Sequence, residues 1–286
     1  MIERVSSTPN QLGECPLWDT ESRWLYWIDI DGMEILRIDP SSGMEATIST
    51  PGRPGSIALT AKPGRLKVAM ENEFVDLDFG DETWETWLTL EPQGTGNRLN
   101  DGRCDRQGRF WVGSMHEDAQ SDRFSGMLHQ VRSGGEHRSV QNQIGISNGT
   151  AFSPDGETMY FADTPRRTVW AYDYDPDSGD RSGQRVFTDF SDLPGWPDGA
   201  CVDADGCYWI SCVLGSAIAR LTPEGELDRI VEPPVEKPTA AAFGGPDLDT
   251  LYVTSIGGDD GFSETSQGHL YAVDVGVRGL PEPVFG

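Results

Sequence analysis

Lysine is scarce in this 286-residue chain, and the whole sequence is short of positive charge. The 22 lysine and arginine residues face 47 aspartate and glutamate residues, which leaves a formal net charge of −25. This balance excludes nucleic acid as a partner, because an acidic surface repels phosphate. The acidic residues are scattered along the chain, which indicates a solvated surface. Two explanations are open: adaptation to high salt, where self-repulsion is screened, or an ordinary acidic cytoplasmic enzyme.

Long apolar runs are also missing. No stretch approaches 18 consecutive apolar residues, so we expect no membrane span. The residues that follow Met1 lack the apolar segment of a secretory signal, so we expect no such signal. The sequence contains neither the G-x-S-x-G motif of serine hydrolases nor a P-loop, so neither a serine hydrolase nor a nucleotide enzyme is indicated.

Cysteine and histidine are few. The five cysteines include no C-x-x-C pair and several lie in strand-like runs, which favours buried, reduced thiols and a cytoplasmic location. The four histidines show no ligand spacing, so we expect them on surfaces or in loops.

One pattern recurs six times along the chain. A polar residue is followed by a short apolar run, a turn rich in Ser, Asp and Gly, and a strand-like run of aromatic and β-branched residues. The copies are spaced 41 to 50 residues apart, and a second pair of strand-like runs lies between them. The polar residues that begin the six copies are Glu14, Ser56, Asn100, Asn148, Asp198 and Thr239.

Each repeat therefore predicts four strands. Units of about 40–50 residues with four strands are typical of a β-propeller. We predict an all-β, six-bladed propeller with four antiparallel strands per blade, in which residues 1–286 form a single domain. The run at residues 2–5 is expected to supply the outer strand that closes the last blade.

Equivalent positions in the inner strands of a propeller converge on its axis. The six polar residues are therefore expected to meet there, and packing does not require them to be polar. Turn or strand-cap roles would also explain individual members, since Asn-Gly and Asp-Gly favour tight turns. Converging oxygen ligands without histidine suit Ca²⁺, Mg²⁺ or Mn²⁺, with Zn²⁺ as a further possibility.

The chain resembles a known family at these same residues. The matching motifs cover nearly the whole chain in the family's order: Gly13-Glu-Cys-Pro-Leu-Trp18, Arg98-Leu-Asn-Asp-Gly102, Gly108-Arg-Phe-Trp-Val-Gly-Ser-Met115, Ile146-Ser-Asn-Gly149 and Pro197-Asp-Gly199. They resemble the gluconolactonase, or senescence marker protein 30 (regucalcin), family. The resemblance implies a six-bladed propeller with one divalent metal ion in its channel, for which we place Ca²⁺ first and Zn²⁺, Mn²⁺ or Mg²⁺ as alternatives.

The resemblance also implies roles for individual residues. Glu14, Asn148 and Asp198 fall on the family's metal ligands, and Asp198 also falls on its proposed general base. Arg98 and Asn100 fall on residues that hold sugar hydroxyls. Asp118 occupies the place where many members carry a substrate-contacting glutamate, although its side chain is shorter.

The expected function is a metal-dependent hydrolase, a lactonase that opens a sugar lactone such as gluconolactone, xylonolactone or arabinonolactone to the aldonic acid. Two alternatives remain open on the same fold. One is a metal-dependent esterase or phosphotriesterase-like lactonase, and the other is a calcium-binding regulatory protein. We expect a monomer, because a closed propeller is self-contained.

Overall fold

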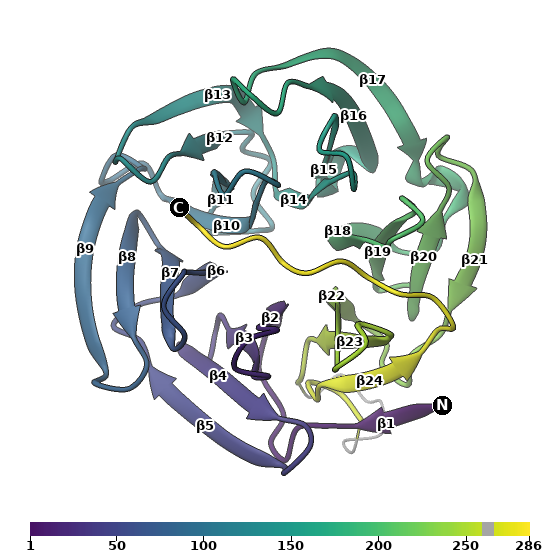
Figure 1. Cartoon of the computed structure of the whole chain (residues 1–286). Coiled ribbons are helices and arrows are strands. Elements are labelled where there is room, and N and C mark those ends of the chain that lie inside the picture. The colour runs from purple at the N-terminus through teal and green to yellow at the C-terminus, as the bar shows by residue number, and fades with distance from the viewer. Residues whose placement is uncertain (259–265) are drawn as a thin grey trace.

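The structure, a computed structural model, describes residues 1–258 and 266–286. Its strands form six four-stranded antiparallel sheets, arranged as blades around a central axis (Figure 1). The predicted all-β, six-bladed propeller with four antiparallel strands per blade is confirmed. The described helical elements are two single 3₁₀ turns, η1 (Thr164–Arg166) and η2 (Phe190–Asp192). Neither of them could cross a membrane.

The N-terminus closes the last blade. Strand β1 (Ile2–Arg4) pairs antiparallel with β24 (Tyr271–Asp274), at the outer edge of a sheet with the order β1-β24-β23-β22. The start and the end of the chain thus share one sheet, and backbone hydrogen bonds hold the ring where it would otherwise open. The closing role expected of residues 2–5 is confirmed for β1.

The first strand of each blade lies next to the axis and is almost wholly buried. These strands carry the polar residues that begin the six repeats. In blades 1 to 6, numbered along the chain, they are β2 (Gly13–Trp18), β6 (Pro54–Leu59), β10 (Asn97–Cys104), β14 (Ser147–Phe152), β18 (Trp196–Val202) and β22 (Pro238–Gly244).

The remaining strands follow outward in each blade, and the outermost ones face solvent. The second strands are β3 (Leu25–Asp29), β7 (Arg65–Met70), β11 (Phe110–His116), β15 (Thr158–Asp163), β19 (Tyr208–Val213) and β23 (Thr250–Ser255). The third strands, besides β24, are β4 (Glu34–Asp39), β8 (Glu73–Asp78), β12 (Gly126–Val131), β16 (Thr168–Tyr174) and β20 (Ala217–Leu221). The outer strands, besides β1, are β5 (Met44–Ser49), β9 (Thr83–Thr89), β13 (His137–Ile144), β17 (Arg181–Asp189) and β21 (Leu227–Val231).

The repeated Asp-x-x-Gly sequence forms a tight turn between the first two strands of a blade. In blade 5 the Asp203 carboxylate accepts hydrogen bonds from the backbone N–H groups two and four residues later, both at 3.0 Å. The Asp105 carboxylate does the same in blade 3, at 3.0 and 2.9 Å. Gly206 and Gly108 adopt φ values of 84° and 82°, which side chains disfavour, and this explains the glycine of the repeat.

The hydrophobic core is a ring of six clusters, one between each pair of neighbouring blades. Between blades 3 and 4, for example, Trp111 packs against Phe152 and Tyr174. Each cluster draws residues from two blades, so a single blade could not bury its own apolar faces. All five cysteines are buried and free, as predicted.

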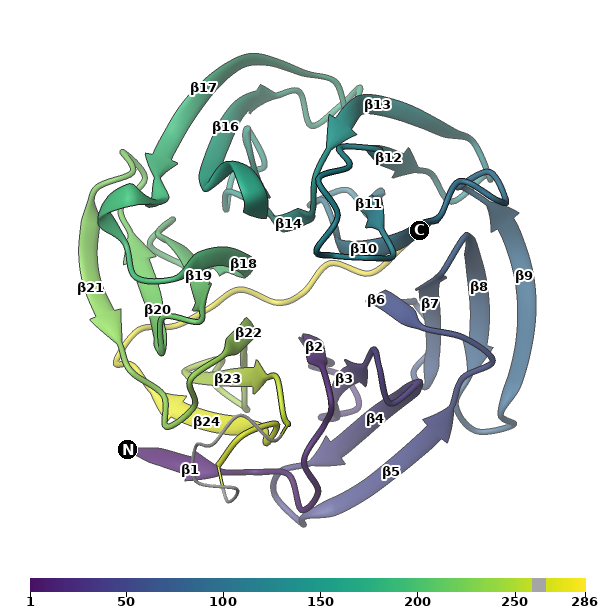
Figure 2. The same ribbon diagram turned by 180° about the vertical axis from the view of Figure 1, so that it is seen from behind.

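Residues 275–286, the C-terminal strap, cross one face of the ring and pass in front of its centre in Figure 1. The strap forms bridges with blade 5 at Gly279 and with blade 2 at Phe285. Beneath it, Arg103 Nη1 donates a hydrogen bond to Glu282 Oε2 at 2.7 Å. The strap therefore covers one end of the channel, and Figure 2 shows it behind the blades from the opposite face.

Candidate active site

Every inner strand departs from regular pairing at its axial position. The register with the second strand shifts across or just after the axial residue in five blades, for example between Glu14 and Leu17 in blade 1, and just before Ser56 in blade 2. A β-bulge re-aims side chains and often lies next to an active site. The backbone is further turned by positive φ values just after two predicted ligands, 49° at Cys15 and 61° at Gly149. The glycines that follow several axial residues in the sequence are the signal for these bulges.

Three predicted site residues are joined by hydrogen bonds. Arg98 donates through Nη1 to Asn100 Oδ1 at 2.7 Å and to the Leu99 carbonyl at 3.1 Å. Asn100 in turn donates through Nδ2 to Asn148 Oδ1 at 3.1 Å and to the Ser147 carbonyl at 2.9 Å. The side chains of Arg98, Asn100 and Asn148 thus form one connected array across blades 3 and 4.

A residue missed in the sequence extends this array to blade 5. Asn148 donates through Nδ2 to Thr164 Oγ1 at 2.9 Å, and Thr164 donates to the Pro197 carbonyl at 2.8 Å. Because Nδ2 of Asn148 is occupied in this way, its Oδ1 is turned toward Asn100. Thr164 therefore orients the amide of one predicted ligand and contacts the strand just before Asp198.

Three carboxylates influence one another in the channel. Burial is the main cause that raises the pKa of Glu14 to about 8, and the negative charge of Asp101 adds to it. The pKa of Asp198 lies well above its usual range, first because of burial and then because of Glu14 and Asp101. Burial raises the pKa of Asp101 as well, although its carboxylate accepts a hydrogen bond from Thr150 N at 2.9 Å. Asp101 belongs to the quoted motif, but sequence reasoning gave it no role.

These residues fit a divalent cation. Buried carboxylates that repel one another are stabilised by a positive charge between them, and carboxylate and amide oxygens are the ligands that hard cations prefer. Glu14, Asn148 and Asp198 together offer two carboxylates and one amide oxygen. In the described part of the chain, no three His, Cys, Asp or Glu side chains are grouped as metal ligands, so the amide of Asn148 is needed to complete the set.

Arg98 lies at the end of the channel opposite the strap, since β10 runs from Arg98 through Asn100 to Arg103, which contacts the strap. Burial lowers the pKa of Arg98 to about 10, and the nearby positive charge of Arg53 adds to this effect. Arg98 therefore stays protonated at neutral pH. Arg53 forms a partly exposed ion pair with Asp31 at 3.4 Å, and sequence reasoning had not placed either residue near the site.

The structure does not bring Asp118 into contact with this array. Asp118 lies in an exposed loop after β11, where its carboxylate accepts a hydrogen bond from Gln120 N at 3.1 Å. The end of β11, just before this loop, is paired with the start of β10, so Asp118 is at the same end of blade 3 as Arg98. The substrate contact of Asp118 stays a prediction.

Two of the six axial residues have a structural role. Ser56 donates to the Asn100 carbonyl at 2.8 Å, and the Thr239 hydroxyl donates to the Gly13 carbonyl. Both side chains are fully buried, and each ties its inner strand to the next one in the ring. The polar side chains at these two positions are therefore explained by contacts between blades.

The expectation that all histidines lie on surfaces or in loops is wrong for His129, which is buried in β12; His269 is also buried, but it lies in an irregular segment just before β24. His129 Nε2 lies 3.3 Å from Glu91 Oε1, and Glu91 also accepts a hydrogen bond from Ser114. The partners are far apart in the sequence, so no local pattern revealed this buried group.

The fold and the axial array define a propeller whose oxygen-rich channel is closed by a strap at one end. The sequence model of the family described as the SMP-30/Gluconolactonase/LRE-like region matches residues 12–257. The chain belongs to this family, and the resemblance of its motifs is confirmed.

Several known proteins are similar over their full length. The chain is 37% identical to a 6-deoxy-6-sulfogluconolactonase of Pseudomonas putida, over 99% of this chain and 98% of the relative. It is 35% identical to a pentonolactonase of Haloferax volcanii, over 98% and 97% of the two chains. A solved structure of the calcium-binding protein regucalcin from Agrobacterium tumefaciens superposes with a TM-score of 0.92 at 27% identity, over 99% of this chain and 96% of that one.

Proposed function

We propose that this protein is a metal-dependent lactonase that hydrolyses an aldonolactone to its aldonic acid. The observation that carries the proposal is the juxtaposition of two groups on the axis. Glu14, Asn148 and Asp198 are the proposed oxygen ligands, and Arg98 and Asn100 form a polar pair that is hydrogen-bonded to one of them, Asn148. Similarity to two sugar lactonases over the whole chain supports the same reaction class.

The cation proposed here is Ca²⁺, held by Glu14, Asn148 and Asp198, with Zn²⁺, Mn²⁺ and Mg²⁺ as alternatives. A bound divalent cation supplies Lewis-acid polarisation of the lactone carbonyl and favours deprotonation of water. Similarity to a calcium-binding regucalcin supports the choice of ion.

Asp198 is the proposed general base. Its buried carboxylate would accept the proton of the attacking water and later return it to the ring oxygen that leaves. Burial and neighbouring negative charge raise the pKa of Asp198, which strengthens it as a proton acceptor once it is ionised. Thr164 keeps the Asn148 amide in place beside it.

Arg98 and Asn100 are the proposed contacts to the hydroxyl groups of the substrate. A guanidinium offers several donors in a fixed plane, and an amide offers both a donor and an acceptor, which suits a polyol. Their mutual hydrogen bond restricts both side chains before the substrate arrives. This polar side of the channel favours a sugar lactone over an apolar ester. Asp118 is the proposed third contact, reached from its loop above Arg98.

The test is acid release from a panel of aldonolactones, followed with a pH indicator and corrected for spontaneous hydrolysis. Chelated protein is compared with protein that has received Ca²⁺, Mg²⁺, Mn²⁺ or Zn²⁺. We expect turnover of at least one sugar lactone that depends on a divalent cation. Turnover of phosphotriesters or aromatic lactones instead would support the esterase alternative. Cation binding without any turnover would support a calcium-binding protein.

Replacement of Asp198 tests the assignment of the base. Asp198→Asn keeps the size of the side chain but removes its basicity, and we expect kcat to fall by at least about 10²-fold. The matched control is Asp173→Asn, an exposed carboxylate paired with Arg185, which should leave kcat unchanged. Near-normal turnover in Asp198→Asn would show that another group takes the proton.

A further inference from the structure

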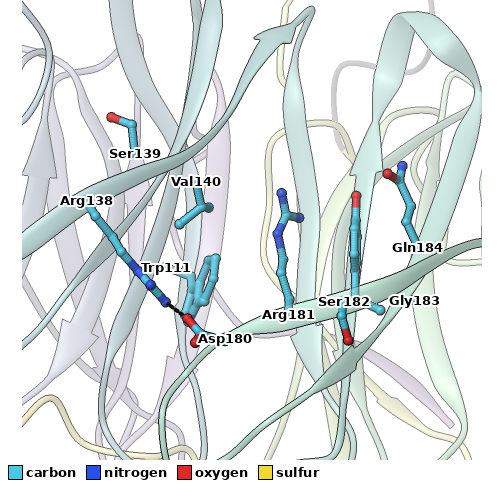
Figure 3. Close-up of a pocket in the computed structure, with 10 residues that line it drawn as sticks. Trp111, Arg138, Ser139, Val140, Asp180, Arg181, Ser182, Gly183 and Gln184 are labelled. Atoms are coloured by element: carbon cyan, nitrogen blue, oxygen red, sulfur yellow. Dashed lines mark ion pairs between the residues drawn. The ribbon is translucent and has the colours of Figure 1, made fainter.

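A cleft of about 510 Å³ opens at the outer edge of the propeller, between blades 3 and 4. Its walls come from β13 on one side and from β16 and β17 on the other, and Trp111 lies at its base. Figure 3 shows Arg138 and Arg181 on opposite sides of the cleft, with Trp111 between them. This volume falls within the usual range of small-molecule pockets. The cleft is separate from the axial array.

The two arginines of the cleft differ in how their charge is balanced. Arg138 is paired with Asp180 at 2.6 Å, as Figure 3 shows, and it also donates to Gln130 Oε1 and the Gly179 carbonyl. Arg181 has no carboxylate partner among residues 1–258 and 266–286. Its Nη2 donates to Gln141 Oε1 at 2.5 Å.

Arg181 is held in place but keeps unused donors. Its guanidinium lies 4.2 Å from the centre of the Tyr172 ring, and Tyr172 also donates to Gln141 Oε1. Nη1 of Arg181 is buried and has no hydrogen-bond partner in the described residues. Nη1 is closed to solvent, so a ligand in the cleft would contact the partly exposed part of the Arg181 side chain that lines it. An oxyanion there would balance a charge that no carboxylate of the described residues offsets.

Two other open grooves of the described chain lack this feature. The groove between blades 4 and 5 contains Arg185, but Asp173 pairs with Arg185 at 2.7 Å and three further acidic residues line that groove. A third groove, on blade 2, is lined by Glu71 and Glu73 and by no cation. The formal charge of the lining is +1 in the Arg181 cleft, from two arginines and Asp180, and negative in these others. The positive lining distinguishes the Arg181 cleft from these two acidic grooves, on a chain with a net charge of −25.

We propose that this cleft is a second binding site, which takes the oxyanion group of a small polyhydroxylated molecule, the carboxylate of a sugar acid or the phosphate of a sugar phosphate. Arg181 binds the oxyanion through the part of its side chain that lines the cleft. The polar side chains of Ser139, Ser182 and Gln184 line the same cleft and offer hydrogen bonds to hydroxyl groups. The Tyr172 ring supports the guanidinium from one face.

The test is calorimetric titration of the metal-loaded protein with gluconate, glucose 6-phosphate or glucose at constant ionic strength. We expect one of the two anions to bind and neutral glucose to bind at least about tenfold more weakly, because hydrogen bonds to a charged group are the strong ones. The anion that binds identifies the source of the oxyanion. Equal binding of glucose, or binding of no anion, would overturn the proposal.

The paired variants are Arg181→Gln and Arg185→Gln. Both remove one positive charge from β17, but only Arg181 faces the cleft between blades 3 and 4. Arg181→Gln should weaken anion binding at this site at least about tenfold and remove one site from the stoichiometry, while Arg185→Gln should not. Equal effects of both variants would mean that overall charge, not the cleft, is responsible.

If Arg181→Gln fails to fold, Arg181→Lys, which keeps the charge but loses the planar guanidinium group, should show the same loss of anion binding. Unweakened binding in that variant would refute the site. Lactone hydrolysis, measured in parallel, should be unchanged in all three.

Discussion

Arg103 and Glu282 form a largely buried ion pair, although 179 residues separate them in the sequence. Their side chains are 13% and 14% exposed, and the atoms Nη1 and Oε2 lie 2.7 Å apart. Arg103 is on the inner strand of blade 3, and Glu282 is on the C-terminal strap. The pair therefore fastens the strap over the end of the channel opposite Arg98.

We expect Glu282→Gln to lower the free energy of unfolding by about 3 kcal/mol, because removal of one partner leaves a buried charge uncompensated. Chemical denaturation of the wild type and the variant gives this difference. The control is Asp173→Asn, whose ion pair with Arg185 is exposed and contributes little. The double variant Arg103→Gln/Glu282→Gln should regain part of the loss. If the single variant is as stable as the wild type, the strap is not held by this pair.

Stability of the cation-free protein should fall as the pH rises. The pKa of Glu14 is raised to about 8 in the folded chain, above the value of 4.5 for the unfolded chain. Between these values the folded state binds more protons than the unfolded state, so the free energy of unfolding decreases as the pH rises from 4.5 to about 8, and the contribution of protonated Glu14 is lost over this range. A bound divalent cation should remove this dependence, because it stabilises the ionised carboxylate.

Thermal unfolding with a chelator and with added Ca²⁺, from pH 5 to pH 9, measures both slopes. Glu14→Gln in chelator should show a smaller decline than the wild type. A decline of equal steepness with and without the cation would contradict the assignment of Glu14 as a ligand.

The repeats predicted the blades because each copy is a local hairpin with its own apolar runs and turn residues. The predicted ligands were found by the same periodicity and by their motifs, and Asn100 and Asn148 do contact each other on the axis. Contacts made by residues outside the repeats could not be predicted from the sequence in this way. Nothing in the sequence around Glu282 predicts its contact with Arg103, since the strap lies outside the six copies.

Other features depend on three-dimensional charge or backbone geometry. Arg181 has no carboxylate partner among the described residues, and this could not be predicted because it depends on which side chains surround it in the fold. Asp118 was assigned by position in a motif, but its loop leaves the carboxylate bonded to Gln120 N. The bulges at the axis have a weak local signal in their glycines, and blade 1 has Cys15 instead, with a φ of 49° that its residue type does not favour.

Salt should stabilise the protein if its acidic surface is adapted to high ionic strength. The net charge of −25 produces self-repulsion that chloride salts screen, mostly below about 1 M, where the Debye length reaches about 3 Å. We expect the unfolding temperature to rise by at least about 5 °C between dilute buffer and 1 M KCl, which corresponds to roughly 3 kcal/mol for a chain of this size. A sucrose series is the control for stabilisation by solvent exclusion. An unfolding temperature that is independent of KCl would favour an ordinary acidic enzyme.

Asp101 should strengthen cation binding without being one of the predicted ligands. Its charge raises the pKa of both Glu14 and Asp198, while its carboxylate accepts a hydrogen bond from Thr150 N. Asp101→Asn retains an oxygen acceptor for Thr150 but removes one negative charge. We expect cation affinity to fall about tenfold or more, because a unit charge a few ångströms away contributes several kcal/mol at an effective dielectric constant of about 20.

The same variant should have the opposite effect on the cation-free protein. Repulsion among the channel carboxylates decreases, so Asp101→Asn should be more stable than the wild type in chelator at pH 9. Calcium titration and thermal unfolding on one preparation provide both readouts, and Asp76→Asn, an exposed carboxylate paired with Lys67, is the control. A purely structural role for Asp101 would lower stability in chelator as well, because the loss of a packing contact does not depend on the cation. Weaker binding combined with higher cation-free stability would therefore identify Asp101 as an electrostatic part of the site.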